Sequence, residues 1–211
     1  MKKVGLYTIV DQALCSAHDW DPVRLAKSIL DGGAKFIQLR MSLAGSGAFL
    51  QLCDRVVAAA EPFNAKVILN DRADLVRMSG SHGVHVGQSD LPLPAVRRLL
   101  PGKAIVGLST HNLSQVTAVV AENASYIAVG PIFETSTKQT GYSARGVELV
   151  KRSVARQDRP VVAIGGITLN RVPEIMGAGA AGVAVISDLL FGNQPERRVR
   201  SYLDCLEGLS K

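Results

Sequence analysis

The chain has 211 residues, of which 47% are hydrophobic, 20% are charged and 5% are aromatic, and its formal net charge is +6. This composition is typical of a soluble globular protein, and scattered basic residues with few aromatics argue against a nucleic-acid-binding surface. No apolar stretch is long enough to predict a membrane span, and three cysteines without a Cys-x-x-Cys motif argue against a disulfide framework or a zinc site.

Short apolar runs alternate with longer amphipathic runs along the whole chain. Strands are predicted near residues 4–10, 36–40, 66–69, 83–86, 104–107, 125–129, 160–164 and 181–186. Helices are predicted near residues 21–31, 46–60, 72–78, 93–99, 112–121, 146–156, 170–177 and 196–208. Asp21 before Pro22, and Asn112, occupy positions typical of helix starts. Eight βα units predict a single-domain (β/α)8 TIM barrel over residues 1–211, with an open doubly wound sheet as the alternative.

The first strand also bears on the compartment in which the protein works. Its apolar run is short and is interrupted by Asp11, so it is interpreted as a strand and not as a signal peptide. Few and widely spaced cysteines fit a reducing compartment, which favours a cytoplasmic location. A homo-oligomer is compatible with the sequence, which does not define an oligomeric state.

The strand near 125–129 leads into the loop 130–138, which contains Thr135, Thr137 and Lys138. Hydroxyl groups give direction to an anion, and lysine binds phosphate as a compact positive charge. Polar residues also follow several other predicted strands. In a barrel enzyme the reactive groups come from these C-terminal strand ends, so we expect a phosphorylated substrate there.

The loops after the last two predicted strands contain Gly165-Gly166 and Ser187. Barrel enzymes often bind phosphate with the backbone N–H groups of these loops, and glycine allows close approach of the backbone. The sequence therefore predicts a phosphate site here. Two turn glycines and a helix-capping serine are the alternative.

Asn70-Asp71 and Asp90 follow two neighbouring predicted strands. Two carboxylates together with phosphate oxygens are the ligands that Mg²⁺ prefers. Both aspartates also precede predicted helices, so helix capping is the simpler explanation from spacing alone.

Gln38 and Arg40 end the second predicted strand, where two-residue alternation places them on one face. An amide there could bind a heterocycle edge and a guanidinium could bind phosphate, with an interior salt bridge of Arg40 as the alternative. Ser109 follows the fifth predicted strand and could form a hydrogen bond with a ligand. No Gly-x-Ser-x-Gly motif surrounds it, which argues against a nucleophilic serine. His85 is interpreted as a packed, hydrogen-bonded histidine.

The chain resembles the thiamine-phosphate synthase (thiamin phosphate pyrophosphorylase) family across nearly its whole length. The matching segments are residues 5–11, 37–40, 68–71, 83–90, 107–111, 126–138, 162–167 and 182–187. The resemblance implies a TIM barrel that joins 4-amino-5-hydroxymethyl-2-methylpyrimidine diphosphate to 4-methyl-5-(2-phosphoethyl)thiazole. It also implies a Mg²⁺ requirement and a dissociative mechanism that gives thiamine monophosphate and diphosphate.

The resemblance assigns roles by matching position. It implies that Gln38 and Ser109 contact the pyrimidine, and that Arg40, Asn70 and Lys138 hold the diphosphate. Arg40, Ser109 and Lys138 form the implied catalytic set.

The remaining implied roles concern the metal and the second substrate. Asp71 and Asp90 are the implied Mg²⁺ ligands. The residues assigned to the thiazole and its phosphate are Thr135, Thr137, Gly166, Ile186 and Ser187.

One position departs from the family pattern. The family usually has Gln-x-Arg-x-Lys after the second strand, and this chain has Gln38-Leu-Arg40-Met-Ser42. A cation is therefore missing beside the leaving group. Because this lysine is absent, one alternative function is a non-catalytic protein that binds thiamine precursors. A related thiazole tautomerase-like isomerase is another, although the retained Thr-x-Thr-Lys set favours the transferase.

Overall fold

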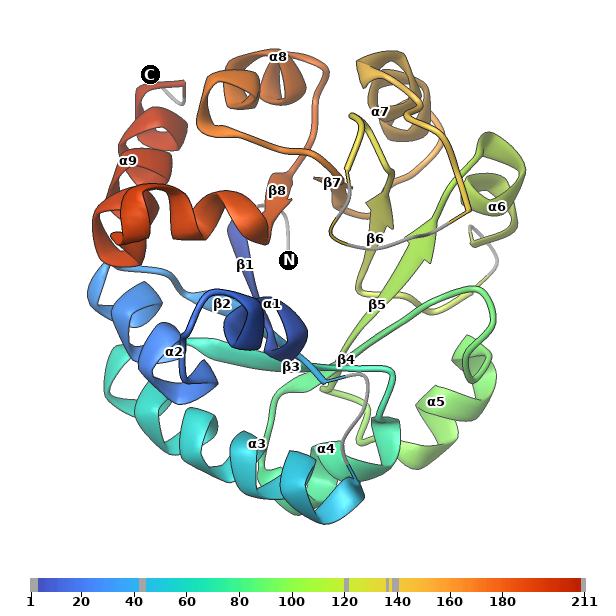
Figure 1. Cartoon of the computed structure of the whole chain (residues 1–211). Coiled ribbons are helices and arrows are strands. Elements are labelled where there is room, and N and C mark those ends of the chain that lie inside the picture. Colours follow the sequence, from blue (N-terminus) through green and yellow to red (C-terminus); the bar gives the residue numbers. More distant parts are fainter. Residues whose placement is uncertain (1–3, 42–44, 120–121, 136, 138–140, 210–211) are drawn as a thin grey trace.

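The structure is a computed structural model that describes residues 4–41, 45–119, 122–135, 137 and 141–209. Parallel strands form a closed barrel in which each strand pairs with the next and β8 pairs with β1 (Figure 1). The strands are β1 (Gly5–Asp11), β2 (Phe36–Arg40), β3 (Lys66–Asn70), β4 (Gly83–Val86), β5 (Ile105–Thr110), β6 (Tyr126–Val129), β7 (Val161–Ile164) and β8 (Gly182–Val185). The predicted TIM barrel is confirmed, and the open sheet is wrong.

Helices surround the barrel, as Figure 1 shows. They are α1 (Gln12–Ala17), α2 (Pro22–Asp31), α3 (Ser46–Ala60), α4 (Ala73–Ser79), α5 (Leu93–Leu99), α6 (Leu113–Ala118), α7 (Val147–Val154), α8 (Val172–Gly177) and α9 (Pro195–Gly208). Shorter 3-10 turns are η1 (Glu61–Phe63), η3 (Leu169–Arg171) and η4 (Ser187–Asn193). The predicted elements are all present with slightly shifted ends, and α1 is the helix that the sequence analysis missed.

The helix starts follow the predicted capping chemistry. The side chain of Asp21 accepts a hydrogen bond from the N–H of Arg24, and Pro22 opens α2. Asn112 accepts from the N–H of Gln115 at the start of α6. Such caps satisfy backbone donors that a helix leaves without a partner.

Two apolar layers form the core. The larger layer lies between the outward faces of the strands and the helices. The smaller layer fills the barrel interior and consists of Tyr7, Ile9, Phe36, Ile68, Tyr126, Val162 and Ala184. These inward residues alternate with outward ones along each strand, because successive side chains in a strand point to opposite faces. The lumen is therefore packed, and polar inward residues are displaced toward the C-terminal ends of the strands.

No helix in the described part of the chain is long and apolar enough to cross a bilayer. The cysteines that the structure describes are unpaired. Burial raises the pKa of both the Cys15 and Cys53 thiols to about 12. These two thiols are thus inert packing groups near neutral pH.

Candidate active site

A cavity of about 600 Å³ opens at the C-terminal ends of the strands. Its lining includes nine of the predicted site residues: Gln38, Arg40, Asn70, Asp71, Asp90, Ser109, Thr135, Thr137 and Ile186. They come from strands and loops spread around the barrel, as expected for a TIM-barrel active site. Ser109 lies within β5 and not after it, because this strand extends further than predicted.

Arg40 ends β2 and faces the cavity together with Gln38, as the strand alternation predicted. Its Nη1 donates to Oδ2 of Asp11 at 2.8 Å, and the two side chains are 14% and 6% exposed. The other carboxylate oxygen of Asp11 accepts from the N–H of Leu14 at 2.9 Å and caps α1. The interior salt bridge is therefore present, and the guanidinium lines the cavity as well.

Arg40 is the one lysine or arginine among the described residues that line this cavity. Positive charge is therefore scarce along the described lining of this cavity. Two residues of the sequence analysis lie outside the described residues. They are Ser42, which departs from the family pattern, and Lys138, which was predicted to hold the diphosphate.

Asn70 and Asp71 lie at the end of β3 with a direct contact between their side chains. Nδ2 of Asn70 donates to Oδ2 of Asp71 at 2.6 Å. Asp71 adopts a left-handed backbone with φ of 64°. Aspartate and asparagine are the residues other than glycine that most often adopt this conformation, which Asp19, Asn64 and Asn193 also adopt here.

The two aspartates do not act as helix caps. The N-cap residues of α4 and α5 are Arg72 and Pro92. Oδ2 of Asp90 instead accepts from the N–H of Gly87 at 2.7 Å, within the loop that follows β4. The capping explanation is therefore wrong for both residues.

The carboxylates at the mouth of the cavity suit a hard cation that also binds substrate. No group of three or more histidine, cysteine, aspartate or glutamate residues that could hold a metal occurs in the described ranges. Asp71 and Asp90 line the same cavity. Mg²⁺ is commonly held by one or two carboxylates plus substrate phosphates and water, so this donor set fits Mg²⁺ and not a closed protein cage.

Gln38 and Ser109 are joined by buried side chains that the sequence analysis did not assign to the site. Gln38 Nε2 donates to the hydroxyl of Tyr7 at 2.7 Å, and the hydroxyls of Tyr7 and Tyr126 are 2.8 Å apart. Nδ1 of His85 lies 2.9 Å from the Tyr126 hydroxyl, and its Nε2 lies 2.9 Å from Ser109 Oγ. We call Tyr7, Tyr126 and His85 the lumen relay.

The two tyrosines of the lumen relay are neutral. Burial raises the pKa of both Tyr7 and Tyr126 well above the usual tyrosine value. Both hydroxyls therefore keep their protons at any ordinary pH. The packed, hydrogen-bonded state predicted for His85 is confirmed.

A second pocket of about 450 Å³ adjoins the first, and Thr135 and Thr137 line both. Gly166 and Ser187, the predicted phosphate residues, line the second pocket. Oγ1 of Thr137 lies 3.4 Å from Oγ of Ser187, which connects the loops after β6 and β8. Ser187 opens η4, but Ile186 is the N-cap residue there, so the capping explanation for Ser187 is wrong.

The glycines after β7 allow tight packing of this loop. Gly165 and Gly166 both have positive φ, 98° and 62°. A Cβ on Gly165 would lie 2.6 Å from Cα of Pro131, and one on Gly166 would lie 2.4 Å from the carbonyl oxygen of Glu134. Both positions therefore require glycine, as a close approach of two backbones does.

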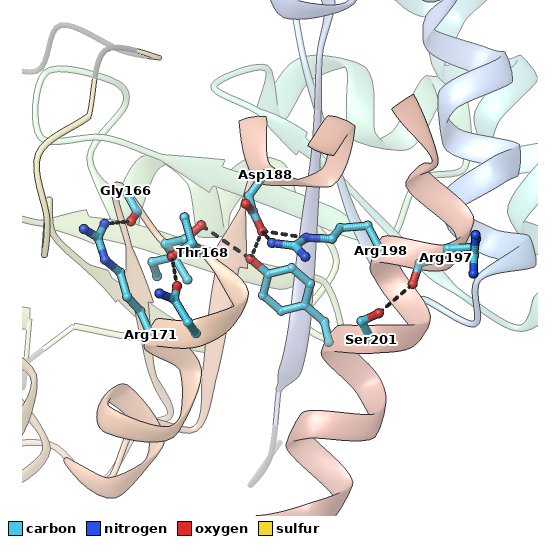
Figure 2. Close-up of polar contacts among 10 residues, drawn as sticks. Gly166, Thr168, Arg171, Asp188, Arg197, Arg198 and Ser201 are labelled. Carbon is cyan, nitrogen blue, oxygen red and sulfur yellow. Dashed lines mark hydrogen bonds and ion pairs between the residues drawn. The ribbon is translucent and has the colours of Figure 1, made fainter. Parts of the chain in front are cut away.

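Figure 2 shows polar contacts around Asp188 and Arg171, two charged residues that line the second pocket. Arg198 donates to Oδ2 of Asp188 through Nε at 2.9 Å and Nη2 at 2.7 Å, and the hydroxyl of Tyr202 donates to the same oxygen. Arg171 donates to the carbonyl oxygen of Gly166 and lines the pocket. Arg171 is a cation near the predicted phosphate site that no sequence pattern indicated.

Known proteins resemble this chain closely. A family model described as thiamine monophosphate synthase matches residues 6–189. Thiamine-phosphate synthase of Anaeromyxobacter dehalogenans is 42% identical over 192 residues, which cover 91% of this chain and 83% of that protein. The Leptospira biflexa protein of the same name is 36% identical over 196 residues, with 91% and 92% coverage. Thiamine phosphate pyrophosphorylase from Pyrococcus furiosus superposes with a TM-score of 0.90 at 25% identity, covering 100% and 98%.

Proposed function

The chain belongs to the thiamine monophosphate synthase family, and we propose that its barrel joins a pyrimidine diphosphate to a thiazole phosphate with the help of Mg²⁺. The chain is thus a transferase of thiamine biosynthesis. The substrates are 4-amino-5-hydroxymethyl-2-methylpyrimidine diphosphate and 4-methyl-5-(2-phosphoethyl)thiazole, and the products are thiamine monophosphate and diphosphate.

The observation that best supports this reaction is the pair of adjoining pockets. One contains the predicted pyrimidine, diphosphate and metal residues, the other contains the predicted phosphate residues, and Thr135 and Thr137 line both. Two substrates seated on either side of these threonines would have their reacting atoms close together. Such positioning converts a bimolecular reaction into an effectively unimolecular one.

In the proposed mechanism, the diphosphate leaves with the bonding electron pair and a pyrimidine-methyl cation remains, stabilised by the electron-donating amino group. The lone pair of the thiazole nitrogen then forms the new carbon–nitrogen bond. No protein nucleophile is required. Gln38 and Ser109 hold the pyrimidine, while Arg40 and Lys138 offset negative charge that grows on the leaving oxygens.

Asp71 and Asp90 would hold Mg²⁺, which supplies further neutralisation of the diphosphate charge. The two carboxylates that line one cavity support this assignment. Asn70 would steady Asp71 through their hydrogen bond and donate to the diphosphate.

Turnover of the purified protein with both substrates and Mg²⁺ tests the proposal. Formation of thiamine monophosphate, with one diphosphate released for each, is expected. Binding of either substrate without turnover would instead identify a thiamine-precursor binder. Conversion of a thiazole carboxylate phosphate between its tautomers, without coupling, would identify an isomerase. A protein with Thr135→Ala and Thr137→Ala should bind the pyrimidine diphosphate but couple it slowly.

A further inference from the structure

The lumen relay has a direction, set by the number of protons that each member carries. Gln38 donates from Nε2 to the oxygen of Tyr7. A tyrosine hydroxyl has a single proton, so Tyr7 donates it onward to Tyr126. Tyr126 in turn donates to Nδ1 of His85, which places the imidazole proton on Nε2, where it is donated to Ser109 Oγ.

This direction determines what the two ends offer to a ligand. The amide nitrogen of Gln38 donates to Tyr7, so the amide oxygen Oε1 is available to accept a hydrogen bond from a ligand. Ser109 accepts from His85, so its own O–H serves as a donor. The two ends are separated by 71 positions in the sequence, yet they cannot change roles independently, because a reversal at one end requires every intervening proton to move.

We propose that the lumen relay fixes the hydrogen-bonding roles of Gln38 and Ser109 together, so that the cavity selects a heterocycle edge with a donor facing Gln38 and an acceptor facing Ser109. A 4-aminopyrimidine presents this edge, through its amino group and its ring nitrogen. A 4-oxopyrimidine presents the reverse order, a carbonyl and a ring N–H. The inference rests on the proposed function, which places the pyrimidine on these two residues.

The surroundings support a dedicated network. β5 has glycine at position 107, where a Cβ would lie 2.2 Å from Cζ of Tyr126 and 2.5 Å from Nδ1 of His85. Phe36 packs beneath, with ring centroids 4.4 Å from Tyr7 and 5.9 Å from Tyr126. A larger residue on β5 would therefore break the relay, and the ring of Phe36 gives the two tyrosines an apolar floor.

Tyr126 is the decisive member for an experiment. It is fully buried, and it is the one relay member that does not line the cavity. Its hydroxyl therefore acts on a ligand through its neighbours and not by contact. Tyr126, Tyr7 and His85 are positioning residues, and Tyr126→Phe removes the central hydroxyl while keeping the ring.

The first test compares the 4-amino and 4-oxo pyrimidine diphosphates as substrates of wild type and Tyr126→Phe. We expect the preference in kcat/KM for the amino compound to fall about tenfold in the variant, the effect of losing one oriented hydrogen bond. KM for the thiazole phosphate should not change. Thr110→Val is the matched control, because Thr110 is a buried hydroxyl beside Ser109 that donates outside the relay, to the carbonyl of Ala128 at 3.0 Å.

The second test reads the relay directly in the free protein. ¹⁵N NMR of the His85 imidazole should give a protonated Nε2 and an unprotonated Nδ1 in wild type. Tyr126→Phe should give a mixture of the two tautomers, while Thr110→Val should match wild type. A wild-type protein with the proton on Nδ1 would overturn the proposed direction.

The outcomes separate this inference from the proposed function. If wild type forms thiamine monophosphate and Tyr126→Phe retains the full preference for the amino compound, the inference is wrong and the function stands. If wild type forms no thiamine monophosphate, the proposed function is wrong, and the His85 tautomer still decides whether the relay has the direction described here.

Discussion

Arg40 forms an ion pair with Asp11 and has a proposed role in turnover, and a double-mutant cycle with Asp11 separates the two. Arg40→Met removes the charge and keeps most of the apolar stem. It leaves the Asp11 carboxylate, which is 6% exposed, without its cation. Breaking a buried ion pair costs about 3–5 kcal/mol. Asp11 keeps its hydrogen bond from the N–H of Leu14, and the adjoining cavity can admit water, so we expect a loss of about 2–3 kcal/mol.

Asp11→Asn combined with Arg40→Met removes both charges, and the asparagine can still cap α1. We therefore expect the double variant to recover most of the lost free energy of unfolding. Urea denaturation measures the cycle directly, and for a domain of this size the single variant should melt about 4–12 °C lower. The activity should not recover in the same way. Both Arg40→Met and the double variant lack the guanidinium, so kcat should fall by about 10²–10³-fold in each.

This contrast between stability and turnover is the test of the assignment. If the double variant recovers kcat along with stability, then Arg40 supports the fold only and does not act on the diphosphate. If the single variant is as stable as wild type, then the ion pair with Asp11 contributes little and the stability argument is wrong. Asp11→Asn alone is the reference that completes the cycle.

Four further outcomes are expected. Lys138→Ala should lower kcat by about a hundredfold, because charge on the leaving group grows toward the transition state; a change confined to KM for the thiazole phosphate would contradict this. Asp90→Asn should shift the Mg²⁺ dependence of the rate to higher concentration, and an unchanged Mg²⁺ titration would remove Asp90 from the metal site. Ser42→Lys should raise kcat by up to about tenfold if it restores a missing charge contact, whereas a flat or lower rate would indicate that another cation already occupies that space. Burial and, to a lesser degree, the charge of Lys66 lower the pKa of His82. The unfolded chain therefore takes up a proton at higher pH than the folded one, and stability should fall as the pH drops below about 6.5. The free energy of unfolding in urea should differ less between pH 7.5 and pH 5.5 for His82→Gln than for wild type.

The barrel could be predicted because its signals are local. Each strand is a short apolar run, and each run is followed by an amphipathic helix with a recognisable start, such as Asp21 before Pro22. The shared face of Gln38 and Arg40 also follows from two-residue alternation within one strand. The helix α1 was missed because six residues are too few to establish a helical period.

The parts of the site that sequence reasoning missed depend on closure of the barrel. Tyr7 and Tyr126 are 119 positions apart, and only the ring of strands brings their hydroxyls together. Alternation could have placed both tyrosines in the lumen but could not have paired them. The position of Arg171 at the second pocket likewise depends on how the loop after β7 turns. The left-handed backbone of Asp71 has no sequence signal, since aspartate adopts many conformations.

The contact between the loops after β6 and β7 has a consequence for how this enzyme can evolve. The N–H groups of Ile132 and Phe133 donate to the carbonyl oxygens of Ile164 and Gly165 at 2.9 and 3.0 Å, and the glycines leave no space for a side chain. The two loops are thus joined through their backbones, so a side chain at position 165 or 166 cannot be accommodated by changing a side chain in residues 131–134. Directed-evolution libraries that vary residues 165–166 should yield mostly inactive proteins, and varying residues 131–134 in the same library should not restore them.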